Sequence, residues 1–102
     1  MATEPIHLVV LTPSEVLLAS SQVKQVHAHL ADGGSIGILP RHAPLIAETV
    51  AAPLTYVDEQ GRHTLELEPG ILHIDRSGVT VLTSGRSHPA QAAQSPVEQA
   101  DS

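Results

Sequence analysis

Apolar and polar residues alternate along most of the chain between positions 6 and 83, and a period of two is that of a β-strand with one buried face. Turn-forming residues interrupt the alternation about every eight to twelve positions, which is typical of an all-β sandwich or barrel. We therefore predict an all-β fold. The expected strands are Ile6–Thr12, Val16–Ala19, Gln22–Leu30, Ile36–Leu39, Pro44–Val50, Leu54–Asp58, His63–Glu68, Ile71–Asp75 and Val79–Thr83.

Two short turns within this pattern predict β-hairpins, at Asp58–Gly61 and at Arg76–Gly78, and each ends in glycine. Within the segment Gln22–Leu30, the alternation places Val26 on one face and Val23 on the other. Strands with one polar face must bury the other, so we predict a two-layer antiparallel β-sandwich. Its predicted aliphatic core includes Leu8, Val10, Ile38, Leu65, Leu67, Leu72 and Leu82.

Two prolines bracket an Arg-His pair near the middle of the chain. Pro40 and Pro44 lack a backbone donor, and each biases the preceding residue toward an extended conformation. Arg41 and His42 should therefore lie at a rigid corner that faces the surface. The corner contains no catalytic set of side chains, and the residues alone leave two interpretations open: a pair of rigid turns with one exposed histidine, or a docking surface.

The composition restricts the function classes. A chain of 102 residues forms one domain at most, and Tyr56 is its only aromatic residue. The absence of cysteine excludes disulfides, a thiolate zinc site and a cysteine nucleophile. The net charge is −6 and the five basic residues are scattered, which argues against nucleic-acid binding. The chain has neither a signal-peptide pattern nor an apolar run of membrane-spanning length, so we expect a soluble cytoplasmic protein.

The composition changes after Gly85. Residues 86–102 are small and polar, with Pro89 and Pro96 leaving only short windows for a helix. We predict a folded domain over residues 1–85 and a disordered polar tail over residues 86–102.

Two histidines supply the main alternative function. His27 and His29 share one strand face, about 7 Å apart along the chain, which suits two metal ligands. No third ligand is identifiable, so a solvated or interface face competes with a metal site. The alternative is a free-standing β-sandwich that binds a small ligand or a metal. We find no nucleophile motif and no phosphate loop, and we expect neither enzyme activity nor a cofactor.

Four segments resemble the epsilon subunit of F-type ATP synthases. Gly37–Ile46 closely resembles the family signature GxLGILPGHAPLL, and Ile6–Pro13 resembles its opening HLxVVTPE. Pro69–Ile74 is similar to GGxLEV, and Val79–Leu82 to VTVLA. The four matches occur in the family's order and spacing, which makes the resemblance far more specific than a single short motif.

The resemblance implies an N-terminal β-sandwich of about ten strands at the foot of the rotary central stalk. It implies a non-catalytic subunit that couples c-ring rotation to the gamma subunit for proton-driven ATP synthesis. The complex would lie at the cytoplasmic face of the bacterial inner membrane, with this chain peripheral to it. Transferred by position, the gamma-facing residues are Thr12, Arg41, His42 and Ala47, and the c-ring-facing residues are Asp32, Gly33, Gly34 and Ser35.

The chain departs from the family pattern at three of these positions. Ser35 stands where an acidic residue is common, Arg41 where glycine is common, and Ala47 where threonine is frequent. The family's C-terminal helical hairpin has no counterpart in the proline-broken tail. We therefore expect a naturally short epsilon subunit.

Overall fold

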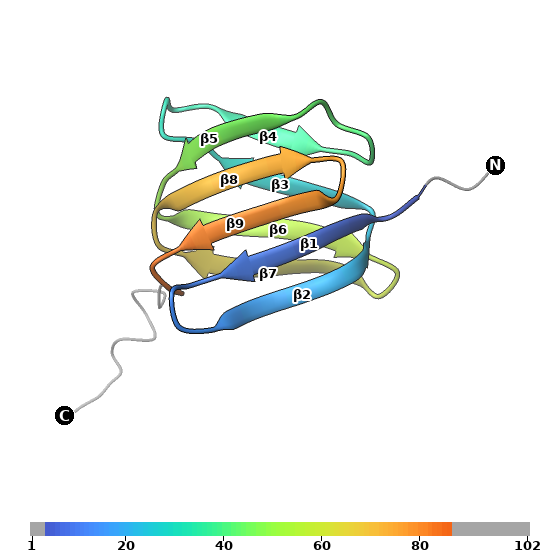
Figure 1. The fold of residues 1–102 in the computed structure, drawn as a ribbon, viewed down its shortest axis with the longest axis horizontal. Helices are drawn as coiled ribbons and strands as arrows, with labels where there is room; N and C mark the ends of the chain where they lie inside the picture. Colours follow the sequence, from blue (N-terminus) through green and yellow to red (C-terminus); the bar gives the residue numbers. More distant parts are fainter. Residues whose placement is uncertain (1–3, 87–102) are drawn as a thin grey trace.

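The computed structural model describes residues 4–86, and in this range it contains nine strands and no helix (Figure 1). The prediction of an all-β fold is confirmed. The strands are β1 (Ile6–Leu11), β2 (Val16–Val23), β3 (Gln25–His29), β4 (Ser35–Ile38), β5 (Leu45–Thr49), β6 (Ala52–Asp58), β7 (Gly61–Leu67), β8 (Gly70–Asp75) and β9 (Gly78–Thr83).

Two sheets lie face to face as a sandwich (Figure 1). One sheet has the order β2-β1-β9-β8-β5, and the other has the order β4-β3-β6-β7. The predicted pairing is wrong at one place, because β1 and β9 run parallel. Parallel neighbours need a long connection between them, and here the seven intervening strands provide it.

The core between the sheets is aliphatic, as predicted for most of the expected positions. Five of the seven predicted residues are buried, and Leu65 is half-buried. The prediction fails at Leu82, whose side chain is 47 % exposed. Val81 and Thr83 occupy the inner face of β9, so Leu82 between them must point outward. The buried predicted residues are Leu8, Val10, Ile38, Leu67 and Leu72.

The inner face of β9 ends in a buried polar residue, Thr83. Its hydroxyl donates to the carbonyl oxygen of Glu68 at 2.8 Å, so the buried hydroxyl is satisfied. The alternation in β9 therefore runs from Val79 through Val81 to Thr83, with one polar residue on the inner face.

The predicted strand Gln22–Leu30 is two strands that belong to different sheets. The chain leaves β2 at Val23 and enters β3 at Gln25, with the backbone N–H of Lys24 donating to the carbonyl oxygen of Val57 at 2.7 Å. This change of sheet breaks the alternation. Val23 and Val26 are consequently both fully buried, against the prediction that they lie on opposite faces.

Both predicted hairpins are present, and the described fold reaches slightly beyond its predicted end. Asp58 pairs with Gly61 and Asp75 pairs with Gly78. Arg86 forms a bridge with Leu67, one residue past the predicted boundary. The rest of the predicted tail lies outside the described residues, and its disorder stays a prediction.

Gly78 fits the β8–β9 hairpin against β1. Its φ is 138°, and a Cβ atom there would meet the backbone carbonyl oxygen of His7. Only glycine combines this backbone conformation with so close an approach. The hairpin can therefore sit beside the first strand of the chain.

We expect Gly78→Ala to lower the free energy of unfolding by about 2 kcal/mol or more, through backbone strain and the clash with His7. Gly37→Ala is the matched control, because no atom lies within 4 Å of a Cβ built there. Chemical denaturation of both variants measures the effect. Equal stability of Gly78→Ala and the wild type would contradict the described contact.

Candidate protein-docking surfaces

The chain passes from β4 to β5, and so from one sheet to the other, through the predicted proline corner. The backbone N–H of His42 donates to the carbonyl oxygen of Leu39 at 3.1 Å. Pro40 and Arg41 are the two central residues of this turn, and Arg41 has a φ of 68°. Proline followed by a residue with positive φ is the pattern of a type II turn, in which the second position favours glycine. Arginine there costs about 1 kcal/mol or more.

The His42 side chain is half-buried in the corner. Its Nδ1 donates to the carbonyl oxygen of Ala43 at 2.7 Å. This hydrogen bond fixes the ring orientation and leaves Nε2 available to another molecule. The corner thus presents a rigid backbone with one held imidazole.

A groove of about 1030 Å³ separates the corner from the β8–β9 hairpin and the start of β1. Arg41 and His42 line it from the corner, while Asp75 and Arg76 line it from the hairpin. Because backbone turns form two of its walls, the groove is a preformed feature of this end of the sandwich.

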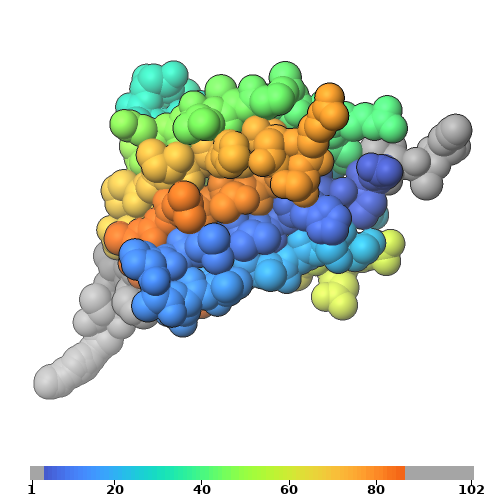
Figure 2. All heavy atoms as spheres, viewed as in Figure 1, coloured from blue at the N-terminus to red at the C-terminus, as the bar shows by residue number. Residues whose placement is uncertain are grey.

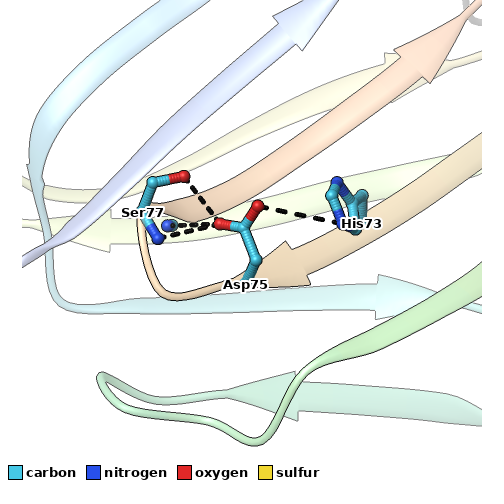
Figure 3. Close-up of polar contacts among 4 residues, drawn as sticks. His73, Asp75 and Ser77 are labelled. Carbon is cyan, nitrogen blue, oxygen red and sulfur yellow. Dashed lines mark hydrogen bonds and ion pairs between the residues drawn. The ribbon is translucent and has the colours of Figure 1, made fainter.

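Asp75 holds the hairpin wall of the groove (Figure 3). Its Oδ1 accepts hydrogen bonds from Ser77 Oγ at 2.6 Å, Ser77 N at 2.8 Å and Gly78 N at 3.2 Å. His73 Nε2 lies 3.8 Å from Oδ2. The Ser77 hydroxyl, then the backbone donors and the nearby His73, hold the pKa of Asp75 below its ordinary value. One oxygen of this carboxylate, Oδ1, is therefore occupied by its own turn.

The outer face of the five-stranded sheet carries an apolar band that sequence reasoning missed. Leu82 lies on this face between its two register partners, Ile71 on β8 and Leu11 on β1. Leu11 is in turn paired with Val16 on β2. Ile46 on β5 is 69 % exposed on the same face. In Figure 2 the strands of this sheet lie side by side across the molecule, with no described segment over them. We call these five residues the apolar band.

The structure does not bring the four predicted gamma-facing residues together. Arg41 and His42 lie at one end of the sandwich, and Thr12 follows β1 at the opposite end (Figure 1). Thr12 Oγ1 accepts hydrogen bonds from the backbone of the next turn. Ala47 pairs with the buried Leu72, so its side chain is on the inner side of β5. Their role at an interface stays a prediction.

The predicted c-ring-facing residues form the exposed turn between β3 and β4. Asp32 Oδ1 accepts a hydrogen bond from the backbone N–H of Gly34 at 2.8 Å, and Gly33 has a φ of 95°. Ser35 opens β4, paired with His29. The turn therefore lies at the opposite end of β4 from the Arg41 corner, and its contact with a c-ring is untested.

His27 and His29 lie side by side on the outer face of the four-stranded sheet. Their rings are 5.1 Å apart between centroids and perpendicular. Within residues 4–86, no three histidine or acidic side chains are grouped so as to hold a metal ion. A pair alone falls short of the three or four protein ligands of a zinc site, so the geometry does not favour the metal-binding alternative.

Comparison with known proteins identifies the family. Residues 5–87 match the model of the β-sandwich domain of the ATP synthase delta/epsilon chain. The chain belongs to this family. It is 35 % identical to the ATP synthase epsilon chain of Roseiflexus sp. (strain RS-1) over 78 residues, which cover 76 % of the chain and 55 % of the relative. The chain thus spans about half the length of that relative.

Two solved structures share the fold of this delta/epsilon-type chain. One is the cryo-EM structure of the Euglena gracilis mitochondrial ATP synthase with its OSCP, F1 and c-ring, at a TM-score of 0.73, with 20 % identity over 82 % of this chain and 53 % of the other. The second is the cryo-EM structure of the central stalk and c-ring of the Tetrahymena thermophila mitochondrial ATP synthase, at a TM-score of 0.70. The sequence identity is 10 %, and the match covers 100 % of this chain and 84 % of the other. In the described part of the delta/epsilon-type chain, no helix is suited to crossing a membrane.

A polar cluster at the β6–β7 hairpin of the delta/epsilon-type chain also escaped sequence reasoning. His63 Nε2 is 3.0 Å from Asp58 Oδ1, and the His63 ring stacks on Tyr56 with 4.9 Å between ring centroids. The His63 hydrogen bond is the main reason that the pKa of Asp58 lies below its ordinary value. The spacing of Asp58 and His63 across a hairpin was the only sequence signal.

We expect acid to weaken the fold partly through Asp58. A carboxylate with a lowered folded-state pKa stabilises the protein fully above its unfolded pKa of about 3.9, and this contribution is lost as the pH falls through the folded value. Asp58→Asn should therefore flatten the decrease in stability below about pH 4. Urea denaturation over a pH series measures it, with Glu59→Gln at the same turn as control. Identical pH profiles for Asp58→Asn and wild type would refute the coupling.

Proposed function

We propose that this chain is a non-catalytic subunit of the central stalk of a bacterial F-type ATP synthase. The observation that carries the proposal is the family match over residues 5–87, nearly the whole described domain. The Tetrahymena structure with the same fold is of a central stalk and c-ring, which supports the assignment to the rotor. The chain would lie peripherally at the cytoplasmic face of the inner membrane, as part of the complex.

Its role would be mechanical coupling of c-ring rotation to the gamma subunit during proton-driven ATP synthesis. Transmission of torque requires a rigid body with two attachment surfaces. The sandwich offers rigidity through two hydrogen-bonded sheets around a close-packed core. The nucleotide chemistry would belong to other subunits.

We assign the gamma attachment to the apolar band on the five-stranded sheet. Exposed aliphatic side chains on one sheet face gain free energy when a partner removes them from water, at about 25 cal/mol per Å² of apolar surface. The band extends from β2 to β5, between the turn at Thr12 and the Arg41 corner. It therefore connects the predicted gamma-facing residues that are far apart in the structure.

We assign the c-ring attachment to the β3–β4 turn. Asp32, Gly33, Gly34 and Ser35 are all exposed there. The turn lies at the end of the sandwich away from the Arg41 corner. Contacts at this turn and along the apolar band would use separate surfaces, so both partners could bind at once.

We expect Leu82→Asp to weaken binding to the purified gamma subunit at least about tenfold, because it places a charge in the middle of the apolar band. The fold should survive, since Leu82 is half-exposed. Calorimetry or biolayer interferometry measures the affinity.

Thr64→Asp is the matched control, since it introduces the same residue at an exposed position of β7 in the other sheet. The control should bind like the wild type. Unchanged affinity of Leu82→Asp would remove the apolar band from the interface. A wild-type chain that does not bind gamma would overturn the proposed function itself.

A further inference from the structure

The outer face of the four-stranded sheet is hollowed by a pocket of about 230 Å³. Three neighbouring strands, β3, β6 and β7, supply its lining. Four of the five lining side chains can donate a hydrogen bond, and none carries a carboxylate. With neutral histidine the lining has a formal charge of +1, in a chain whose net charge is −6. The lining residues are Gln25, His27, Thr55, Val57 and Arg62.

The strand register determines how these side chains surround the pocket. Gln25 on β3 and Arg62 on β7 both pair with Val57, which lies between them on β6. Paired residues share a face, with Cβ atoms about 5 Å apart, so the two long side chains stand on either side of Val57. His27 pairs with Thr55 at the next outward position along the same strands. The four donors therefore surround a small apolar floor.

The rest of the described chain leaves these donors free. Within residues 4–86, the Arg62 guanidinium has no ion pair, and the side chains of Gln25 and Thr55 form no hydrogen bond. The His27 ring contacts the edge of the His29 ring, and this contact restricts its rotation. The donors are consequently available to an acceptor that enters from solvent.

Acidic residues of the same strands do not neutralise the pocket. The Asp58 carboxylate is bonded within its own hairpin. Glu66 is two outward positions beyond Arg62 on β7, about 13 Å along the strand. On the β4 side, Gly37 pairs with His27 and has no side chain, with no atom within 4 Å of a Cβ built there. An anion can therefore approach over β4.

We propose that this pocket binds a phosphate group, either free or esterified. A tetrahedral phosphate presents acceptor oxygens in four directions, which suits donors that stand on three strands. Arg62 supplies charge-assisted hydrogen bonds, and Gln25, His27 and Thr55 supply neutral ones. A planar carboxylate has two oxygens and would leave part of this donor set unused. The pocket lies in the other sheet from the apolar band, so the inference does not depend on the proposed function.

Arg62→Gln and Thr55→Val test the pocket by removing the charge and the hydroxyl separately. Titration of the wild-type chain with sodium phosphate, at constant ionic strength and followed by NMR, should shift the backbone amide signals of Gln25, His27 and Thr55 saturably. Arg62→Gln should weaken the affinity about tenfold. Thr55→Val should weaken it about fivefold, and valine suits a strand position.

Arg76→Gln is the matched control. It removes an exposed arginine at the β8–β9 turn, outside the pocket, and it lowers the charge of the chain by the same amount. This variant should bind phosphate like the wild type.

A second arm distinguishes the two sources of the phosphate group. Phosphatidylcholine vesicles with and without phosphatidic acid present the esterified form, and sedimentation measures the bound chain. Binding to phosphatidic acid that Arg62→Gln weakens identifies a lipid headgroup as a ligand, whereas binding of inorganic phosphate alone identifies a soluble one.

Saturable binding in either arm, weakened by Arg62→Gln and unchanged by Arg76→Gln, supports the proposal. Absence of saturable binding in both arms overturns it, as does equal affinity of wild type and Arg62→Gln. Equal weakening by the two arginine variants also overturns it, because the effect would then come from net charge alone. None of these results bears on gamma binding, which Leu82→Asp tests separately.

Discussion

The structure depends on the pairing of its first and last strands. β1 lies beside β9 in parallel, with Leu8 opposite Val79 and Leu11 opposite Leu82. This register determines which face of both strands is buried, because side chains in neighbouring strands share a face at paired positions. Leu8 and Val79 enter the core, whereas Leu11 and Leu82 face outward together. The contact of Gly78 with His7 allows this approach.

The same register produces the exposed apolar face that we propose as the attachment surface. Because Leu8 and Val10 of β1 and Val79 and Val81 of β9 fill the core, Leu11 and Leu82 must lie on the outside of the five-stranded sheet. A chain without Phe or Trp packs its core with aliphatic residues alone. The aliphatic residues of the apolar band lie outside this core, on the outer face of the five-stranded sheet, and an exposed apolar patch of this kind suits a docking role. The stability of the fold and the proposed attachment surface both derive from one strand pairing.

Local patterns in the sequence were sufficient for the strands and the hairpins. Alternation depends only on neighbouring residues, so it marked most strands and the turns at Gly61 and Gly78. It failed where the chain changes layers, as at Lys24, and where apolar residues occupy both faces of a strand, as at Leu82. The orientation of Ala47 depends on its pairing with β8, which alternation alone does not give.

The candidate surfaces were only partly predictable for the same reason. The proline corner is a local feature, and its rigidity followed from the positions of Pro40 and Pro44. Its positive φ at Arg41 and its place beside the β8–β9 hairpin arise from the folded chain. The apolar band joins residues from β1, β2, β5, β8 and β9, which only the sheet order brings together.

Hydroxyl-radical footprinting of the assembled ATP synthase, compared with the isolated chain, tests the central claim that the outer face of the five-stranded sheet is the attachment surface. The account predicts that Leu82, Ile71 and Ile46 react in the isolated chain and become protected in the complex. His27 and His29, on the outer face of the other sheet, should react equally in both. Protection of the two histidines with Leu82, Ile71 and Ile46 unchanged would contradict the account.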